Sequence, residues 1–174
     1  MIVLITGASH AGKTVLAQKI LERYHYPYLS MDLLKMGFIR SHYIHATPED
    51  DDALQEYMWP VIREIIKTAI ENRQNLVIEG SYIPFGWEES FSVEYLREIR
   101  YYCLIMSGRY IENHFLDIQA HACDVEKRVD DTWCTMEVLV EENARYLDMC
   151  EKYQYPFILV DDDYEVEVDL SIEH

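Results

Sequence analysis

The stretch that decides the fold is a short apolar run followed by a glycine-rich segment, Gly7-Ala8-Ser9-His10-Ala11-Gly12-Lys13-Thr14. The segment matches the pattern G-x-x-x-x-G-K-[ST], whose glycines let successive backbone N–H groups turn inward around an anion. The apolar residues 2–6 before it predict a buried strand, and the amphipathic residues 13–24 after it predict a helix. A strand, this loop and a helix in that order predict a phosphate-binding loop.

The residues of this loop have distinct expected contributions. Lys13 supplies positive charge toward the β and γ phosphates of a nucleotide, and the Thr14 hydroxyl suits Mg²⁺. The sequence therefore predicts ATP and Mg²⁺ as cofactors. The expected nucleotide-binding residues are Gly7, Ala8, Ser9, His10, Ala11, Gly12, Lys13 and Thr14.

Hydrophobic periodicity predicts that strands and helices alternate along the rest of the chain. Further strands are expected near residues 26–30, 75–79, 100–106 and 156–160, and helices near residues 31–38, 48–73, 93–99, 109–121 and 132–153. Thr47-Pro48 predicts the start of the longest helix, which Pro60 should kink or divide. The alternation predicts an α/β fold: a three-layer αβα arrangement around a five-stranded, mostly parallel sheet.

Length and charge exclude several classes of protein. The 174 residues are enough for one ordinary domain and too few for two, so we expect a single domain over residues 1–174. The net charge of −17 disfavours binding to long nucleic acid and to anionic membranes. No apolar run reaches the roughly 18 to 20 residues that span a bilayer, and no export leader is recognisable. The four dispersed cysteines are expected to be reduced, which favours a cytoplasmic location: Cys103, Cys123, Cys134 and Cys150.

The C-terminal residues 161–174 contain seven acidic residues and neither Lys nor Arg. Such a segment is most simply a solvated terminus. The alternation of polar and apolar residues over 164–168 also allows an edge strand, whose charges would discourage pairing with another sheet.

Four further residues are candidates for catalysis or metal binding, because the carboxyl ends of parallel strands gather at one edge of a sheet. Asp32 follows the second strand and could accept a proton from an attacking hydroxyl, although a helix first-turn acid is the alternative. Glu79 ends the third strand and could organise Mg²⁺ together with Thr14. Arg109 and Arg128 could neutralise the transferring phosphoryl group, or could simply pair with acidic residues. Residues 122–131 could form a short lid.

On these motifs the chain resembles the small-molecule kinases of the P-loop superfamily. That group includes adenylate, shikimate and gluconate kinases, with chloramphenicol phosphotransferase and zeta toxin as relatives. The segment Ser30-Met31-Asp32-Leu33-Leu34-Lys35 is similar to the G-D-L-L-R segment of adenylate kinases, and Leu76-Val77-Ile78-Glu79-Gly80 resembles the D-G segment that ends their third strand. The resemblance implies ATP-dependent phosphorylation of a small metabolite.

The leading hypothesis is an ATP- and Mg²⁺-dependent phosphotransferase that acts on a small-molecule hydroxyl positioned by Asp32. A nucleoside monophosphate kinase is the first alternative, although Lys35 replaces an expected Arg and Ser81-Tyr82-Ile83-Pro84 replaces the F-P-R of adenylate kinases. The second alternative is a nucleotide-dependent binding module without phosphoryl transfer. The expected partners are a nucleotide triphosphate and a small-molecule acceptor.

Overall fold

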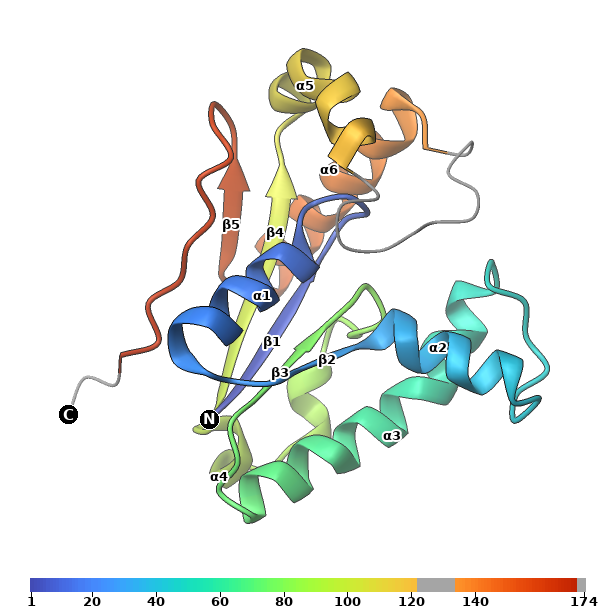
Figure 1. Ribbon diagram of the computed structural model, residues 1–174, viewed down its shortest axis with the longest axis vertical. Helices are drawn as coiled ribbons and strands as arrows, with labels where there is room; N and C mark the ends of the chain where they lie inside the picture. The colour runs from blue at the N-terminus through green and yellow to red at the C-terminus, as the bar shows by residue number, and fades with distance from the viewer. Residues whose placement is uncertain (122–133, 172–174) are drawn as a thin grey trace.

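A five-stranded parallel sheet forms the centre of the molecule in the computed structural model, which describes residues 1–121 and 134–171 (Figure 1). Its strand order is β2-β3-β1-β4-β5, and all four strand pairings are parallel. The elements along the chain are β1 Ile2–Gly7, α1 Lys13–Tyr24, β2 Tyr28–Ser30, α2 Met31–Arg40, α3 Asp51–Glu71, β3 Leu76–Glu79, the 3₁₀ turn η1 Trp87–Ser90, α4 Val93–Leu96, β4 Ile99–Met106, α5 Gly108–His121, α6 Met136–Tyr153 and β5 Phe157–Val160.

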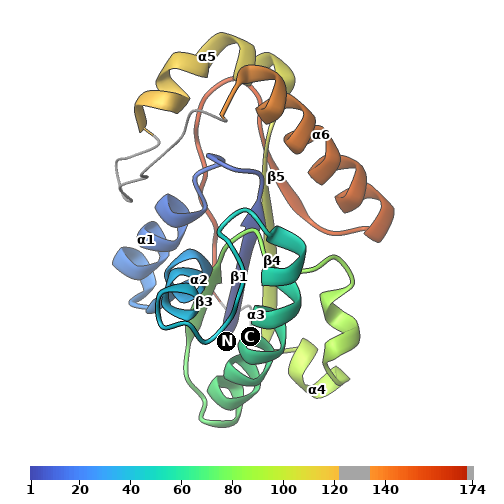
Figure 2. The ribbon, with the colours of Figure 1, turned by 90° about the vertical axis from the view of Figure 1, so that its right-hand side faces the viewer.

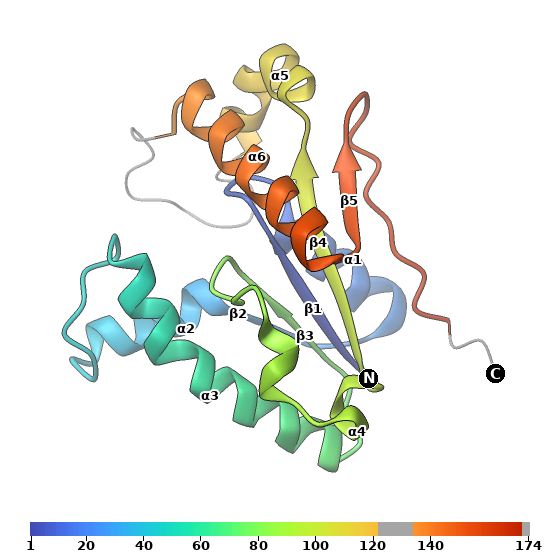
Figure 3. The same ribbon diagram turned by 180° about the vertical axis from the view of Figure 1, so that it is seen from behind.

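Helices cover both faces of the sheet, which Figure 2 shows with α1 on one side and α6 on the other. Successive side chains of β1 alternate between the two layers: Ile2 and Leu4 pack with α2, α3 and α6, whereas Val3 and Ile5 pack with α1 and α5. Figure 3 shows α6 in front of β4 from the opposite side. The predicted three-layer αβα fold is confirmed.

The buried strand β1 fixes the position of the glycine-rich loop. All six residues of β1 are buried, because the strand lies between β3 and β4 and has helices on both faces. Ile5 is in register with Glu79 of β3, and Gly7 is in register with Leu104 of β4. The ends of three central strands therefore meet at one edge of the sheet.

Helix α3 differs from its prediction at two places. It begins at Asp51 rather than after Thr47, because a closed turn precedes it: the Asp50 carboxylate accepts the Thr47 N–H at 2.8 Å, and the Asp50 N–H donates to the Thr47 carbonyl. The expected division at Pro60 is wrong, since one helix continues through this residue. The buried side chains on both sides of Pro60 offset the cost of about 3 kcal/mol for an interior proline: Leu54, Met58, Ile62 and Ile66.

One boundary of α6 and one boundary of α4 also differ from the prediction. Helix α6 was expected from residue 132, but it begins at Met136 with Thr135 as N-cap, whose hydroxyl accepts the Val138 N–H at 3.3 Å. Helix α4 ends at Leu96, before the expected residue 99, because Ile99 already belongs to β4. Among the described residues, no helix is both long and apolar enough to cross a membrane.

The chain after β5 is the largest departure from expectation. Residues 161–171, called the strap below, bend at 161–163 and belong to no helix or strand, so the edge strand that the sequence allowed over 164–168 does not form. Nor is the segment simply solvated, because Val166, Val168 and Leu170 are buried in the layer that contains α1 and α5. Glu165, Glu167 and Asp169 alternate with these three and are exposed. The strap therefore packs in the same layer as α1, and Figure 1 shows it running alongside β5.

Candidate active site

The loop between β1 and α1 has the backbone conformation that the sequence pattern requires. Gly7 has φ 138°, and a Cβ there would meet the Leu104 carbonyl oxygen of β4 at 2.2 Å. Gly12 has φ 83° and precedes the first residue of α1. A left-handed conformation favours glycine because it has no Cβ to clash. Both glycines of the motif are thus explained by the structure itself.

The N-terminus of α1 has the features that favour an anion. No described side chain caps it, and its first turn contains no acidic residue. The first helical hydrogen bond runs from the Leu16 N–H to the Gly12 carbonyl. The N–H groups of Lys13, Thr14 and Val15 therefore remain as donors at the positive end of the helix dipole.

The Lys13 side chain lies inside the loop rather than in solvent. Its residue is 9% exposed, and its ammonium donates to the carbonyls of Gly7 at 3.1 Å and Ala8 at 2.8 Å. The Ser81 hydroxyl donates to the same Gly7 carbonyl at 3.4 Å. The arrangement places one positive charge at the loop, where a polyphosphate can compete with the two carbonyls for it.

A carboxylate from α6 holds the outer part of the loop. Glu142 accepts hydrogen bonds from the Ser9 N–H at 3.1 Å and from the Ser9 hydroxyl at 3.3 Å. No sequence signal predicts this contact, because Glu142 is one of 32 acidic residues and stands in no motif. Helix α6 therefore fixes the loop at Ser9.

The residues proposed for magnesium are a hydroxyl and a carboxylate at the same edge of the sheet. Glu79 is the last residue of β3 and is 1% exposed; it is in register with Ile5 of β1 and Ser30 of β2. Thr14 is in the first turn of α1. Oxygen donors of these two types are the ligands that Mg²⁺ prefers beside nucleotide phosphates, so the donor set fits this cation.

Asp32 belongs to a chain of polar contacts that joins three segments. Its carboxylate lies 3.0 Å from the Lys35 ammonium, which also donates to the Tyr82 hydroxyl at 3.0 Å. The Tyr82 hydroxyl in turn donates to Asp51 at 2.8 Å. Burial and then the neighbouring Asp51 raise the pKa of Tyr82, so the phenol remains a neutral donor. Lys35 therefore links Asp32 of α2 to Tyr82 in the loop that follows β3.

Tyr82 and Asp51 were not among the residues predicted for the site. A signal for Tyr82 was available, since it follows the end of β3 by three residues and strand ends gather at this edge. Asp51 has no comparable signal, because the helix start that contains it was placed three residues too early.

Of the two arginines expected near the transferring phosphoryl group, the structure describes only Arg109. Arg109, in the first turn of α5, donates to Asp161 at 2.6 Å and to Asp162 at 2.7 Å. These two acids begin the strap, so the guanidinium already has acidic partners, and its side chain is 57% exposed. Arg128 and the expected lid at 122–131 lie outside the described residues.

Comparisons with known proteins give a result only at the level of structure. No family model matches the sequence, and no curated protein matches it. A candidate kinase from Chloroflexus aurantiacus has a TM-score of 0.57 and 18% identity, over 97% of this chain and 91% of that one. Deoxyadenosine kinase from M. mycoides with bound dATP has a TM-score of 0.56 and 15% identity, over 95% and 93% of the two chains. Shikimate kinase from Bacteroides thetaiotaomicron has a TM-score of 0.50 and 15% identity, over 94% and 90%.

The chain has the fold of the P-loop small-molecule kinases. In this P-loop fold, ligands bind beyond the carboxyl ends of the parallel strands. The structure brings Gly7, Ser30 and Glu79 to that edge through the registers of β1, β2 and β3. Asp32 lies two residues after Ser30, in the first turn of α2. The candidate site therefore consists of the phosphate loop, the end of β3 and the start of α2.

Proposed function

We propose that this protein is an ATP- and Mg²⁺-dependent phosphotransferase that acts on the hydroxyl group of a small molecule. The observation that carries the proposal is the loop at residues 7–14, which encloses the Lys13 ammonium and leads into an uncapped helix N-terminus. Two carboxylates, Asp32 and Glu79, stand at the ends of the neighbouring strands β2 and β3. A protein that only binds the nucleotide, without phosphoryl transfer, would not require this pair of carboxylates.

The loop would bind and orient the triphosphate. The free N–H groups of the first turn of α1 and the Lys13 ammonium supply the donors for its oxygens. Thr14 and Glu79 would hold Mg²⁺, which when bound neutralises charge on the phosphates. The Glu142 contact with Ser9 keeps the loop in one conformation, so that these donors need no reorganisation when the nucleotide binds.

Asp32 would accept the proton of the acceptor hydroxyl as that oxygen attacks the γ-phosphate. Lys35 fixes the direction of the carboxylate, and Tyr82 fixes Lys35. Little covalent chemistry is required of the protein in such a transfer, so most of the rate enhancement would come from positioning and charge stabilisation.

The named relatives suggest which acceptors to test first. Deoxyadenosine kinase and shikimate kinase have this fold and differ in their acceptors, a nucleoside and a hydroxy acid. Both kinds of molecule carry a hydroxyl group, in line with the role proposed for Asp32. A panel of nucleosides, nucleoside monophosphates, sugars and hydroxy acids covers these classes.

The test is acceptor-dependent release of ADP from ATP in the presence of Mg²⁺. We expect one acceptor class to raise ADP formation above the rate without acceptor, and Lys13→Ala to abolish the increase. ATP that binds without any acceptor-dependent ADP formation would instead favour the binding module and overturn the proposal.

Asp32→Asn distinguishes the hydroxyl acceptor from a phosphate acceptor. If Asp32 takes the proton of a hydroxyl, the change lowers kcat by about 10²-fold or more. A nucleoside monophosphate kinase needs no base, so a mild effect would favour that alternative. Asp52→Asn is a matched control, since it removes the same charge at an exposed residue in the first turn of α3.

A further inference from the structure

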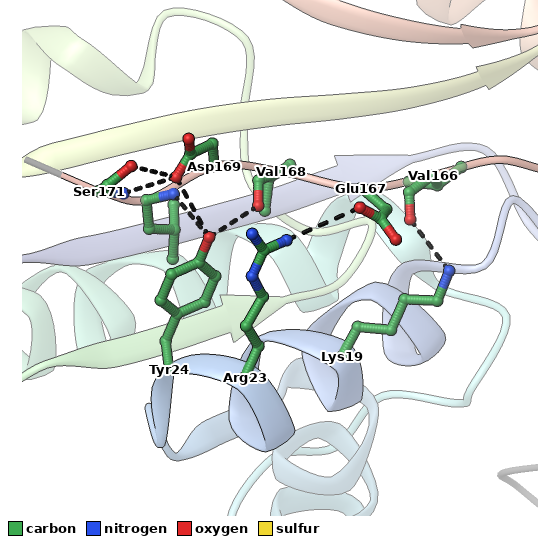
Figure 4. A network of polar contacts seen from close by, with 9 residues as sticks. Lys19, Arg23, Tyr24, Val166, Glu167, Val168, Asp169 and Ser171 are labelled. Carbon is green, nitrogen blue, oxygen red and sulfur yellow. Dashed lines mark hydrogen bonds and ion pairs between the residues drawn. The ribbon is translucent and has the colours of Figure 1, made fainter.

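The strap is attached to α1 along most of its length. Figure 4 shows three side chains of α1 that face it. Lys19 donates to the Val166 carbonyl at 3.0 Å, and Arg23 lies 3.7 Å from the carboxylate of Glu167. The Tyr24 hydroxyl donates to the Val168 carbonyl at 3.2 Å and accepts the Leu170 N–H at 3.2 Å. These contacts hold the strap beside the helix that begins at the phosphate loop.

The first part of the strap reaches the loop itself. The Tyr164 hydroxyl donates to the Ala11 carbonyl at 3.1 Å. The same phenol lies so close to Gly12 that a Cβ built there would meet its oxygen at 1.7 Å. Gly12 is therefore required for two reasons, its positive φ and the approach of Tyr164.

The phenol is a permanent donor at neutral pH. Burial, with a smaller contribution from Tyr110, raises the pKa of Tyr164 to about 12. Its ring packs in the same layer as Val166 and α1. The ring and its hydroxyl are thus held in place independently of any nucleotide.

The direction of one N–H group follows from this hydrogen bond. A trans peptide unit is planar, so its C=O and the N–H of the next residue point in opposite directions. The Ala11 carbonyl points at Tyr164, and the Gly12 N–H must therefore point away from the strap. In a loop of this pattern, that N–H belongs to the donors that surround the phosphates.

We propose that Tyr164 is a positioning residue of the nucleotide site: it fixes the Ala11–Gly12 peptide so that the Gly12 N–H is aimed at bound polyphosphate. The inference rests on the proposed function, since it assigns a residue to the same site. It also gives the acidic C-terminal segment a role in that site. Tyr164 and Ala11 are 153 residues apart in the sequence.

Tyr164→Phe tests the role because it removes the hydroxyl and keeps the ring that fills the space beside Gly12. We expect ATP affinity, measured by calorimetry, to fall about three- to tenfold, as for the loss of one hydrogen bond. We also expect faster amide hydrogen exchange at residues 11–13 in the protein without nucleotide. In steady-state kinetics the KM for ATP should rise more than kcat falls, because the hydroxyl touches neither substrate.

Tyr24→Phe is the matched control. It also removes a phenol hydroxyl that binds the strap, but its partners are Val168, Asp169 and Leu170 rather than the loop. We expect it to change ATP affinity less than twofold and to leave exchange at residues 11–13 unchanged. Equal losses of affinity in both variants would mean that the hydroxyls only stabilise the fold, and would overturn the positioning role.

The failure of this inference is distinguishable from the failure of the proposed function. Wild-type protein that gives no heat with ATP and Mg²⁺ overturns both. Wild-type protein that binds ATP, together with a Tyr164→Phe variant of the same affinity and the same exchange at residues 11–13, overturns the positioning role alone.

Discussion

The phosphate loop and the strap meet at Tyr164, yet they are specified in opposite ways. The loop is defined by the types of eight consecutive residues, and its shape follows from two glycines and from the helix that starts at Lys13. The strap has no motif, and its place depends on contacts with α1. Local backbone chemistry therefore specifies the loop side of this contact, and tertiary packing specifies the strap side.

The two regions also differ in what they contribute. The loop contains Lys13, whose ammonium would supply the positive charge for the proposed phosphate binding. The strap buries Val166, Val168 and Leu170, each of which contributes on the order of 1.5–3 kcal/mol by leaving water. Changes in the loop should therefore act mainly on binding and catalysis, and changes in the strap mainly on the free energy of unfolding.

Lys13→Ala should produce the largest effect. Loss of the ammonium from the loop is expected to lower kcat/KM for ATP by about 10²–10³-fold or more, because in the proposed reaction this charge would stabilise the transferring phosphates. Lys19→Ala is the matched control on the same helix, since the Lys19 ammonium binds the strap carbonyl of Val166 instead. Steady-state kinetics and calorimetry measure kcat/KM and ATP affinity for both variants. Equal losses in the two variants would contradict the separate roles of loop and strap.

Gly12→Ala tests the point where the two regions touch. The new Cβ would collide with the Tyr164 hydroxyl, and alanine at φ 83° is strained, so we expect a loss of about 2–4 kcal/mol in unfolding free energy. Part of this loss is steric and should disappear when Tyr164 is also alanine. Denaturant unfolding of the two single variants and the double variant should give a coupling of about 1–2 kcal/mol. Strict additivity would contradict the close approach.

Val166→Ala and Glu167→Ala compare the two faces of the strap. Val166 is 1% exposed, and loss of its two methyl groups should cost about 2 kcal/mol of unfolding free energy. The Glu167 side chain is 77% exposed in its ion pair with Arg23, so its removal should cost less than about 0.5 kcal/mol. Thermal or denaturant unfolding measures the difference, and similar losses for both would argue that the strap is not packed.

The smallest expected effect is a dependence of stability on acid. Hydrogen bonds from Ser107 and then Arg109 hold the pKa of Asp161 below its ordinary value of 3.8, and the Ser171 hydroxyl and N–H do the same at Asp169. A carboxyl with a lowered folded pKa stabilises the fold above its unfolded pKa, and this contribution is lost as the pH falls through the folded value. Stability should therefore decline below about pH 4, at the unfolded pKa of these carboxyls.

Asp161→Asn should make this decline shallower, because the substituted side chain no longer titrates. The melting temperature between pH 7 and pH 3 measures the slope for the wild type and the variant. Identical slopes would show that the attachment of Arg109 to the start of the strap contributes nothing to acid stability.

Sequence patterns predicted the central sheet more accurately than its surroundings. The five strands were found because each is a short apolar or aromatic-rich run, and buried parallel strands require such runs. The start of α3 was wrong because Thr47-Pro48 and Asp50-Asp51 both have N-terminal signals, and the turn closed by Asp50 decides between them. The Tyr82–Lys35–Asp32 contacts could not be predicted, since they join segments that only the fold brings together.

The sequence by itself determined the strand, the phosphate loop and the helix over residues 2–24, because these depend on glycine dihedrals and on periodicity among neighbours in the chain. Only the tertiary structure decided that Arg109 pairs with Asp161, that Glu142 holds Ser9 and that Tyr164 holds Ala11. Each of these contacts joins residues far apart in the chain, and its formation depends on how the layers pack around the sheet. No local pattern of residue types encodes that packing.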